Sequence, residues 1–171
     1  MWIQIMPPFS IANIFVFQAA WFSAALLRDQ AFWIMVPLLA LHFYFTTSRR
    51  ADLKLVLFLL PLGLLVEMGL ILSELVWYES ALTLPVWMVL LWVHLIISFN
   101  HSLRWLEKVP WIAVAVLGGI SGATSYVAGS NFGAMYMAPP EINTLGILAV
   151  LWALLILLMS RVAKYNNKRV V

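Results

Sequence analysis

Glu67 and His94 are the ionisable residues that lie deepest within apolar stretches of this sequence. Glu67 stands in "GLLVEMGLILSE", and His94 begins "HLIISFNHSLRW". An ionisable side chain at the centre of a bilayer costs about 2.5–3.5 kcal/mol on insertion scales, so such a residue is a functional candidate by default. We predict Glu67 and His94 as candidate catalytic residues that transfer protons in the interior. The alternative is that Glu67 only hydrogen-bonds a neighbouring helix.

The residues around Glu67 share one helix face. They follow one another at intervals of four, three and four: Gly63, Glu67, Leu70 and Glu74. Gly63 lacks a side chain and lets a second helix approach closely on this face. Glu74 lies nearer the outer interface and is expected to be hydrated.

A second polar stripe begins at His94 and has the same spacing: His94, Ser98, His101 and Trp105. His101 comes about 10 Å after His94 along the helix axis, which places it at the cytoplasmic interface. Two helical ligands of one metal ion are normally three or four residues apart, so His94 and His101 are not expected to share an ion.

The candidate substrate-binding residues are polar side chains that can face the bundle interior or a lipid headgroup. They are Asn13, Asn100, His101, Arg104 and Tyr126. His101 and Arg104 are expected to meet anionic headgroups at the cytoplasmic face. We expect the Asn13 side chain to form a hydrogen bond with a polar group inside the bundle. Tyr126 can supply a hydroxyl group to the interior.

His42, His94 and Glu67 come from three predicted helices at similar depth. Two histidines and one carboxylate form a known ligand set for zinc and non-haem iron. No spacing within one helix enforces such a site here, and hydrogen bonding between helices is the favoured role of His42 and His94. We therefore predict no metal site and no cofactor. The sequence also lacks a phosphate loop, a GxSxG nucleophile elbow and an HExxH motif.

The composition places these residues in a membrane protein. Of 171 residues, 64% are hydrophobic and 10% are charged, against about 45–50% and about 25% in soluble domains. The chain has no cysteine, so it forms no disulfide and no thiolate metal site. Its net charge of +3 comes without a basic face or an RNA-binding aromatic motif, so no nucleic-acid partner is predicted.

Six apolar segments are long enough to cross a bilayer, because a crossing needs about 20 residues. They are residues 9–27, 31–47, 55–77, 84–100, 109–128 and 145–162. The breaks between them are mostly short, which favours antiparallel helical hairpins. The predicted fold is an all-α integral membrane bundle of six transmembrane helices, forming one domain over residues 1–171.

The basic residues predict the orientation of this bundle. Nine of the ten lie in alternate breaks on one side: Arg49, Arg50, Lys54, Arg104, Lys108, Arg161, Lys164, Lys168 and Arg169. Arg28 is the tenth and falls on the other side. Short loops rich in Lys and Arg stay cytoplasmic, so both termini are expected inside.

Small residues mark the fifth span. Gly118, Gly122, Ser125 and Gly129 repeat the helical spacing and predict a close-packing seam, the alternative being a groove for a lipid chain. The following stretch "SNFGAMYMAPPEINT" (130–144) is either a plain connecting loop or an amphiphilic lid on the outer leaflet.

Three blocks of the chain resemble a family of small bacterial inner-membrane proteins classified as a domain of unknown function. The blocks are "NIFVFQAAWFSAALL" (13–27), "LPVWMVLLWVHLIISFNHSLRWL" (84–106) and "GGISGATSYVAGSNFGAM" (118–135). The likeness is most specific from Asn100 to Trp105. The family has an acidic position matched by Glu67, and a Gly-Pro pair where this chain has Gly122 and Ala123.

The resemblance implies a polytopic protein of the bacterial inner membrane. Family members are often encoded near enzymes similar to cyclopropane-fatty-acid synthases and flavin amine oxidases, which implies a link to lipid or fatty-acid modification. Membrane lipid and lipid-modifying enzymes are therefore the expected partners, and the family assigns no catalytic residue. Two alternatives stay open: a small proton-coupled transporter lined by Asn13, Glu67 and His94, and an accessory subunit without chemistry.

Overall fold

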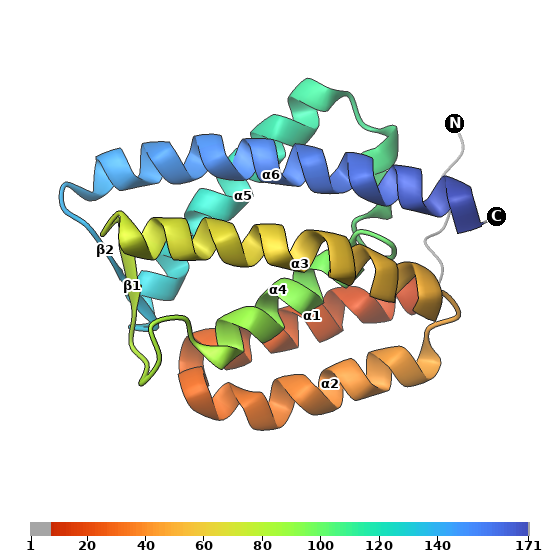
Figure 1. The fold of residues 1–171 in the computed structure, drawn as a ribbon, viewed down its shortest axis with the longest axis horizontal. Coiled ribbons are helices and arrows are strands. Elements are labelled where there is room, and N and C mark those ends of the chain that lie inside the picture. Colours follow the sequence, from red (N-terminus) through yellow and green to blue (C-terminus); the bar gives the residue numbers. More distant parts are fainter. Residues whose placement is uncertain (1–7, 171) are drawn as a thin grey trace.

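The computed structural model describes residues 8–170, with side chains up to residue 167, as six α-helices and one two-stranded sheet (Figure 1). The helices are α1 (Pro8–Leu27), α2 (Phe32–Phe45), α3 (Arg49–Leu72), α4 (Val86–Ser98), α5 (Trp111–Asn131) and α6 (Glu141–Val170). Two short 3₁₀ helices, η1 (Arg28–Ala31) and η2 (Arg104–Lys108), join α1 to α2 and α4 to α5. Each predicted apolar segment overlaps one α-helix, so the all-α class is confirmed.

By length and composition, four helical stretches of the described chain can cross a membrane. They are Pro8–Phe45, Arg49–Leu72, Trp111–Asn131 and Glu141–Asn167. The helix Val86–Ser98 is apolar but shorter. The first of these stretches has 38 residues and contains both α1 and α2.

The chain turns back within this first stretch, at η1. Arg28 has a φ of 53°, a left-handed conformation that interrupts the helix. Its guanidinium Nε donates a hydrogen bond to the carbonyl oxygen of Gly133 at 3.0 Å. As a result, α1 and α2 lie side by side as a hairpin (Figure 1).

The polarity of the molecule is reversed relative to a soluble domain. Asp52 and Glu67 are 0% and 1% exposed, whereas Trp33 and Leu57 are 77% and 71% exposed. Large apolar side chains on the outside need a lipid environment, because water would not solvate them favourably. Buried polar groups need partners from neighbouring helices, and these partners build the site described below.

Helix α4 occupies the centre of the bundle. It packs on α1, α2 and α3, and its buried residues include Trp87, Trp92 and His94. Its apolar residues lie on all sides, as is typical of a helix with no free face. Gly63 of α3 allows the contact with α4, because a Cβ there would lie 2.4 Å from a ring carbon of Trp92. The predicted close approach at Gly63 is confirmed.

A two-stranded antiparallel sheet, which was not predicted from the sequence, closes one end of the bundle. Strand β1 (Val76–Tyr78) pairs with β2 (Met135–Met137), with Trp77 opposite Tyr136. The prediction of a helix through residue 77 is wrong, because α3 ends at Leu72 and Glu74 adopts a φ of 56°. Glu74 therefore lies beyond the helix face that contains Glu67, and it is exposed as expected.

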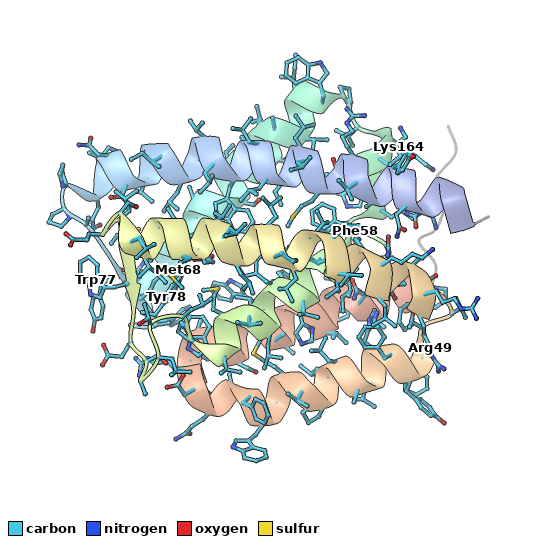
Figure 2. All side chains as sticks on the ribbon, viewed as in Figure 1. Arg49, Phe58, Met68, Trp77, Tyr78 and Lys164 are labelled. Atoms are coloured by element: carbon cyan, nitrogen blue, oxygen red, sulfur yellow. The ribbon has the colours of Figure 1, made fainter. Side chains whose placement is uncertain are left out.

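The polar segments that connect the helices lie at two opposite ends of the bundle. At one end Ser80 Oγ donates to Asp29 Oδ1 at 2.8 Å, beside the sheet. At the other end Lys164 Nζ donates to the carbonyl oxygen of Glu107 at 3.1 Å. Figure 2 shows Trp77 and Tyr78 at the first end, and Arg49 and Lys164 at the second. The side chains of Lys168 and Arg169 lie outside the described residues.

Two glycines of α5 form the predicted close-packing seam, and α6 is its partner. A Cβ at Gly118 would lie 2.6 Å from Ile156 Cβ, and one at Gly122 would lie 2.1 Å from Trp152 Cγ. Ser125 points elsewhere, and its Oγ accepts a hydrogen bond from Trp21 Nε1 of α1 at 2.9 Å.

Substitution of Gly122 by Ala should therefore destabilise the protein by about 1–3 kcal/mol, the usual cost of overpacking. Gly146 on α6 is the control, since a Cβ there meets nothing within 4 Å. Gly146→Ala should be neutral or stabilising by up to about 1 kcal/mol. The free energy of unfolding in mixed detergent micelles measures both effects, and equal losses would contradict the seam.

Candidate functional site

The candidate residues divide into two hydrogen-bonded clusters that share α3. Glu67 is the centre of the first cluster and Asp52 of the second, and both lie on the buried face of α3. These two acidic residues are 15 positions apart, or about 22 Å along a helix. The two clusters therefore occupy different depths of the bundle.

Three donors from three elements hold the Glu67 carboxyl group. Oε1 accepts hydrogen bonds from Tyr126 Oη of α5 at 2.7 Å and from Trp92 Nε1 of α4 at 3.2 Å. Oε2 accepts a hydrogen bond from the hydroxyl group of Tyr78. No Lys, Arg or His of the described chain forms an ion pair with Glu67. Neutral donors alone thus satisfy both of its oxygens.

The small sheet places Tyr78 against Glu67. Alternate residues of a strand point to opposite sides, so Val76 and Tyr78 face inward and Trp77 faces outward, where it stacks on Tyr136. Burial, followed by the nearby charge of Glu67, raises the pKa of Tyr78 well above its usual value of 10. The hydroxyl group of Tyr78 therefore keeps its proton at physiological pH.

A large cavity lies beside the Glu67 cluster. Its volume is about 660 Å³, and its walls come mainly from apolar side chains of α1, α4, α5 and α6. Glu67, Trp92 and Tyr126 all belong to its wall. Trp92 stacks on Trp152 in this wall, with ring centroids 5.4 Å apart. A carboxyl group and its donors thus border a space of ligand size.

The cavity opens sideways, between α1 and α5. Gln18 and Phe22 on α1 line it and are exposed on the surface of the bundle, as are Leu117 and Ser121 on α5. Trp21 and Ser125 also line it, and their hydrogen bond spans the gap between the two helices. Both helices also carry exposed large apolar side chains, such as Phe15 on α1 and Ile120 on α5, so this opening lies on an apolar flank of the molecule.

His42 and His101 belong to the Asp52 cluster. Their Nε2 atoms lie 3.2 Å and 3.0 Å from Asp52 Oδ2. Asn100 Nδ2 donates to Asp52 Oδ1 at 2.7 Å. Thr46 Oγ1 donates to Asp52 Oδ2 at 3.0 Å. The cluster joins the end of α2, the first turn of α3 and the segment after α4, near the end of the bundle that contains Arg49.

This arrangement bears on two sequence-based interpretations of the histidines. His101 was expected to meet lipid headgroups, but it is 8% exposed and turned toward Asp52, because a buried carboxylate needs donors. His42, His94 and Glu67, which were considered together because of their similar depth, do not form one group of donor atoms. Among the described residues, the donor atoms within 4.8 Å of one another belong instead to His42, Asp52 and His101. A role for His42 in bonding between helices is confirmed.

Asn13 and His94 lie outside both clusters. Asn13 Oδ1 accepts a hydrogen bond from Ser102 Oγ at 2.6 Å, which confirms that it finds an inward partner. His94 Nε2 lies 3.2 Å from the carbonyl oxygen of Met35, and its Nδ1 has no hydrogen-bond partner in the described structure. Neither residue lines the cavity that Glu67 borders, so this cavity does not join Asn13, Glu67 and His94.

Arg104 is the candidate that faces outward. Its side chain is 59% exposed, and its Nε lies 4.0 Å from Glu107 Oε1 at the basic end of the bundle. An exposed ion pair of this length contributes little to stability. The guanidinium group is therefore free to meet an anionic headgroup, and this role stays a prediction.

Sequence reasoning missed Asp52, Tyr78 and Trp92. Asp52 stands in the basic break "SRRADLK", where no site residue was predicted, yet it continues the buried face of α3 through Leu55 and Leu59. The alternation in "LVWY" indicates a strand that directs Tyr78 inward. No pattern within the chain pairs Trp92 with Glu67, because that contact depends on how α3 and α4 cross.

Removing one donor from the Glu67 carboxyl group tests the first cluster. We expect Tyr126→Phe to destabilise the protein by about 0.6–1.7 kcal/mol, the range measured for hydrogen bonds within membrane proteins. Tyr44→Phe is the matched control, because Tyr44 is 71% exposed and lies outside both clusters. Thermal unfolding in detergent compares the two, and a loss no larger for Tyr126→Phe than for Tyr44→Phe would contradict the network.

Comparison with known proteins gives a family for the chain. No curated protein and no solved structure matches it significantly. A match to the family described as "protein of unknown function (DUF2878)" extends over residues 10–158 and includes both clusters and every residue that lines the cavity. The chain therefore belongs to the DUF2878 family.

Proposed function

We propose that this protein binds the apolar chain of a membrane lipid in the cavity beside Glu67. The observation that supports this function most strongly is a space of about 660 Å³ that opens on the apolar flank of the bundle and has a carboxyl group in its wall. Pockets for small organic ligands have volumes of about 300–1,000 Å³. A lipid chain can enter such a space from the bilayer without crossing water.

Glu67 gives this cavity a polar recognition point. Trp92 and Tyr126 donate to its carboxyl group and also line the cavity, so a polar group of a bound lipid can take the place of one donor. Trp87 also lines the cavity, and its indole N–H has no hydrogen-bond partner in the described structure. A hydroxyl or carbonyl group on the lipid would satisfy this donor.

The alternatives are less well supported. A transporter path through Asn13, Glu67 and His94 needs these residues in one channel, and they lie in separate groups. An accessory subunit without chemistry should have fully paired interior groups and no cavity, whereas Trp87 Nε1 and His94 Nδ1 are buried without partners. We further propose that the bound lipid is modified, either by this chain or by a partner enzyme.

The proposed setting is a bacterial inner membrane that all six helices cross, with the basic end in the cytoplasm. Support comes from the position of nine of ten basic residues in alternate breaks. Hydrogen bonds also join breaks that were predicted to lie on the same side of the membrane: Ser80 bonds to Asp29 at one end of the bundle, and Lys164 bonds to Glu107 at the other. Helices α2 and α4 have 14 and 13 residues, so flanking segments must complete their crossings.

Filling the cavity tests the proposed function. Ser121 lines the cavity, and its hydroxyl group bonds only within α5, to the carbonyl oxygen of Gly118. The full chain is titrated with dioleoyl phosphatidylglycerol in detergent, and retained lipid is counted by native mass spectrometry. We expect Ser121→Phe to lower occupancy about tenfold, equivalent to about 1.4 kcal/mol of binding free energy.

The adjacent residue provides the control for this experiment. Ile120 is 61% exposed and does not line the cavity, so Ile120→Phe adds a ring to the same helix without filling the space. Its lipid occupancy should equal that of the native chain. Equal occupancy in the native chain and Ser121→Phe, or no retained lipid in the native chain, would refute the proposal.

The orientation has its own test, because the chain contains no cysteine. A single cysteine replacing exposed Glu79 should react with a membrane-impermeant maleimide added outside intact cells, and one replacing exposed Arg50 should react only after the membrane is opened. The reverse pattern would invert the proposed topology, and labelling of both from outside would place both ends outside.

A further inference from the structure

The second cluster, formed by His42, Asp52 and His101, has the composition and geometry of a metal site. It presents two imidazole nitrogens and one carboxylate, and the three donor atoms lie within 4.8 Å of one another. The exposed fractions of these residues are 3%, 0% and 8%. Each residue comes from a different segment of the chain, so only the fold brings them together.

The spacing of the donor atoms fits a first-row transition metal. At metal–ligand distances of about 2.1 Å, neighbouring donors are about 3.4 Å apart around a tetrahedral ion and about 3.0 Å apart around an octahedral one. Asp52 Oδ2 lies 3.2 Å from His42 Nε2 and 3.0 Å from His101 Nε2. An ion bound between the three groups therefore requires only a small adjustment of the side chains.

The surroundings of the cluster favour a bound ion. Thr46 and Asn100 donate to the Asp52 carboxylate and fix its orientation, as outer partners of metal-ligating carboxylates do. Phe9 packs on both imidazoles, with ring centroids 5.4 Å from His42 and 5.0 Å from His101. An apolar cover of this kind keeps bulk water away from a bound metal.

An unpartnered oxygen provides an independent indication. Asn100 Oδ1 is buried and has no hydrogen-bond partner in the described structure, although Asn100 Nδ2 of the same amide contacts Asp52. A buried acceptor without a donor is costly. A water molecule bound to a metal is a donor, and it would both complete the coordination and satisfy this oxygen.

We propose that His42, Asp52 and His101 bind one divalent transition-metal ion, Zn²⁺ or Fe²⁺. Two histidines and one carboxylate are a ligand set for both ions, and three protein ligands leave a position for water. The site is separate from the Glu67 cavity and does not depend on lipid binding there. A cluster held by hydrogen bonds alone is the competing interpretation, and the test distinguishes the two.

Metal content is the first measurement. The full chain, purified without chelator, should contain about one Zn²⁺ or Fe²⁺ per molecule by elemental analysis, in line with a single three-ligand site. After chelation, added Zn²⁺ should restore this ratio and raise the melting temperature. Asp52→Asn and His101→Gln should each weaken Zn²⁺ binding at least about tenfold, a typical effect of disturbing a metal site. His94→Gln is the control and should bind Zn²⁺ like the native chain.

A second experiment is needed in case Asp52→Asn and His101→Gln do not fold. It looks for a new absorption band instead of a loss of metal binding. The chain has no cysteine, so His101→Cys introduces its sole thiol. With Co²⁺ as the probe, the chelated His101→Cys protein should acquire a thiolate-to-cobalt charge-transfer band, because a thiolate replaces an imidazole in the first coordination sphere. His94→Cys should show no such band.

Three results would overturn the inference. The first is a native chain that holds neither ion after purification and shows no rise in melting temperature with Zn²⁺ or Fe²⁺. The second is equal loss of binding in His94→Gln and His101→Gln, which would place the metal elsewhere. The third is a charge-transfer band of equal strength in both cysteine variants. Any of these leaves the lipid-binding proposal untouched.

Discussion

The cost of burying a carboxylate governs the arrangement of this bundle. Helix α3 carries two acidic residues, Asp52 and Glu67, on the face that it turns toward the other helices. Neither can face hydrocarbon unpaired, so each recruits donors from other parts of the chain. The donors to Glu67 come from β1, α4 and α5, and those to Asp52 come from α2 and the segment after α4. Satisfying two carboxylates thus fixes how most of the helices lie against α3.

Much of this architecture could be predicted because solvation leaves few options for an apolar chain. Continuous apolar runs favour helices in a membrane, and the spacing of the glycines at positions 118 and 122 favours close contact between helices. The helices and the close contact of both glycines with α6 were confirmed. The periodicity around Gly63 and Glu67 likewise identified the buried face of α3 correctly, up to the point where that helix ends at Leu72.

The candidate site was harder to predict, because its contacts join residues that are distant along the chain. Depth along a helix placed His42, His94 and Glu67 at one level but could not show which way each helix was turned. No role was predicted for Asp52, which stands among basic residues at the start of α3. It falls on the buried face only when the helical periodicity of α3 is followed back from Glu67 through Leu59 and Leu55. Tyr78 reaches Glu67 from a strand that interrupts the all-helical pattern.

The hydrogen bond from Trp21 to Ser125 has a consequence for how quickly a bound chain can exchange with the bilayer. It is a neutral hydrogen bond that crosses the entrance of the cavity, and a bond of this type stabilises a protein by only about 0.5–1.5 kcal/mol. The packing of α5 on α6 need not change when it opens. Under the proposed lipid binding, breaking this hydrogen bond adds only a small energetic cost to entry and release, and a bound lipid is expected to exchange while the bundle stays folded.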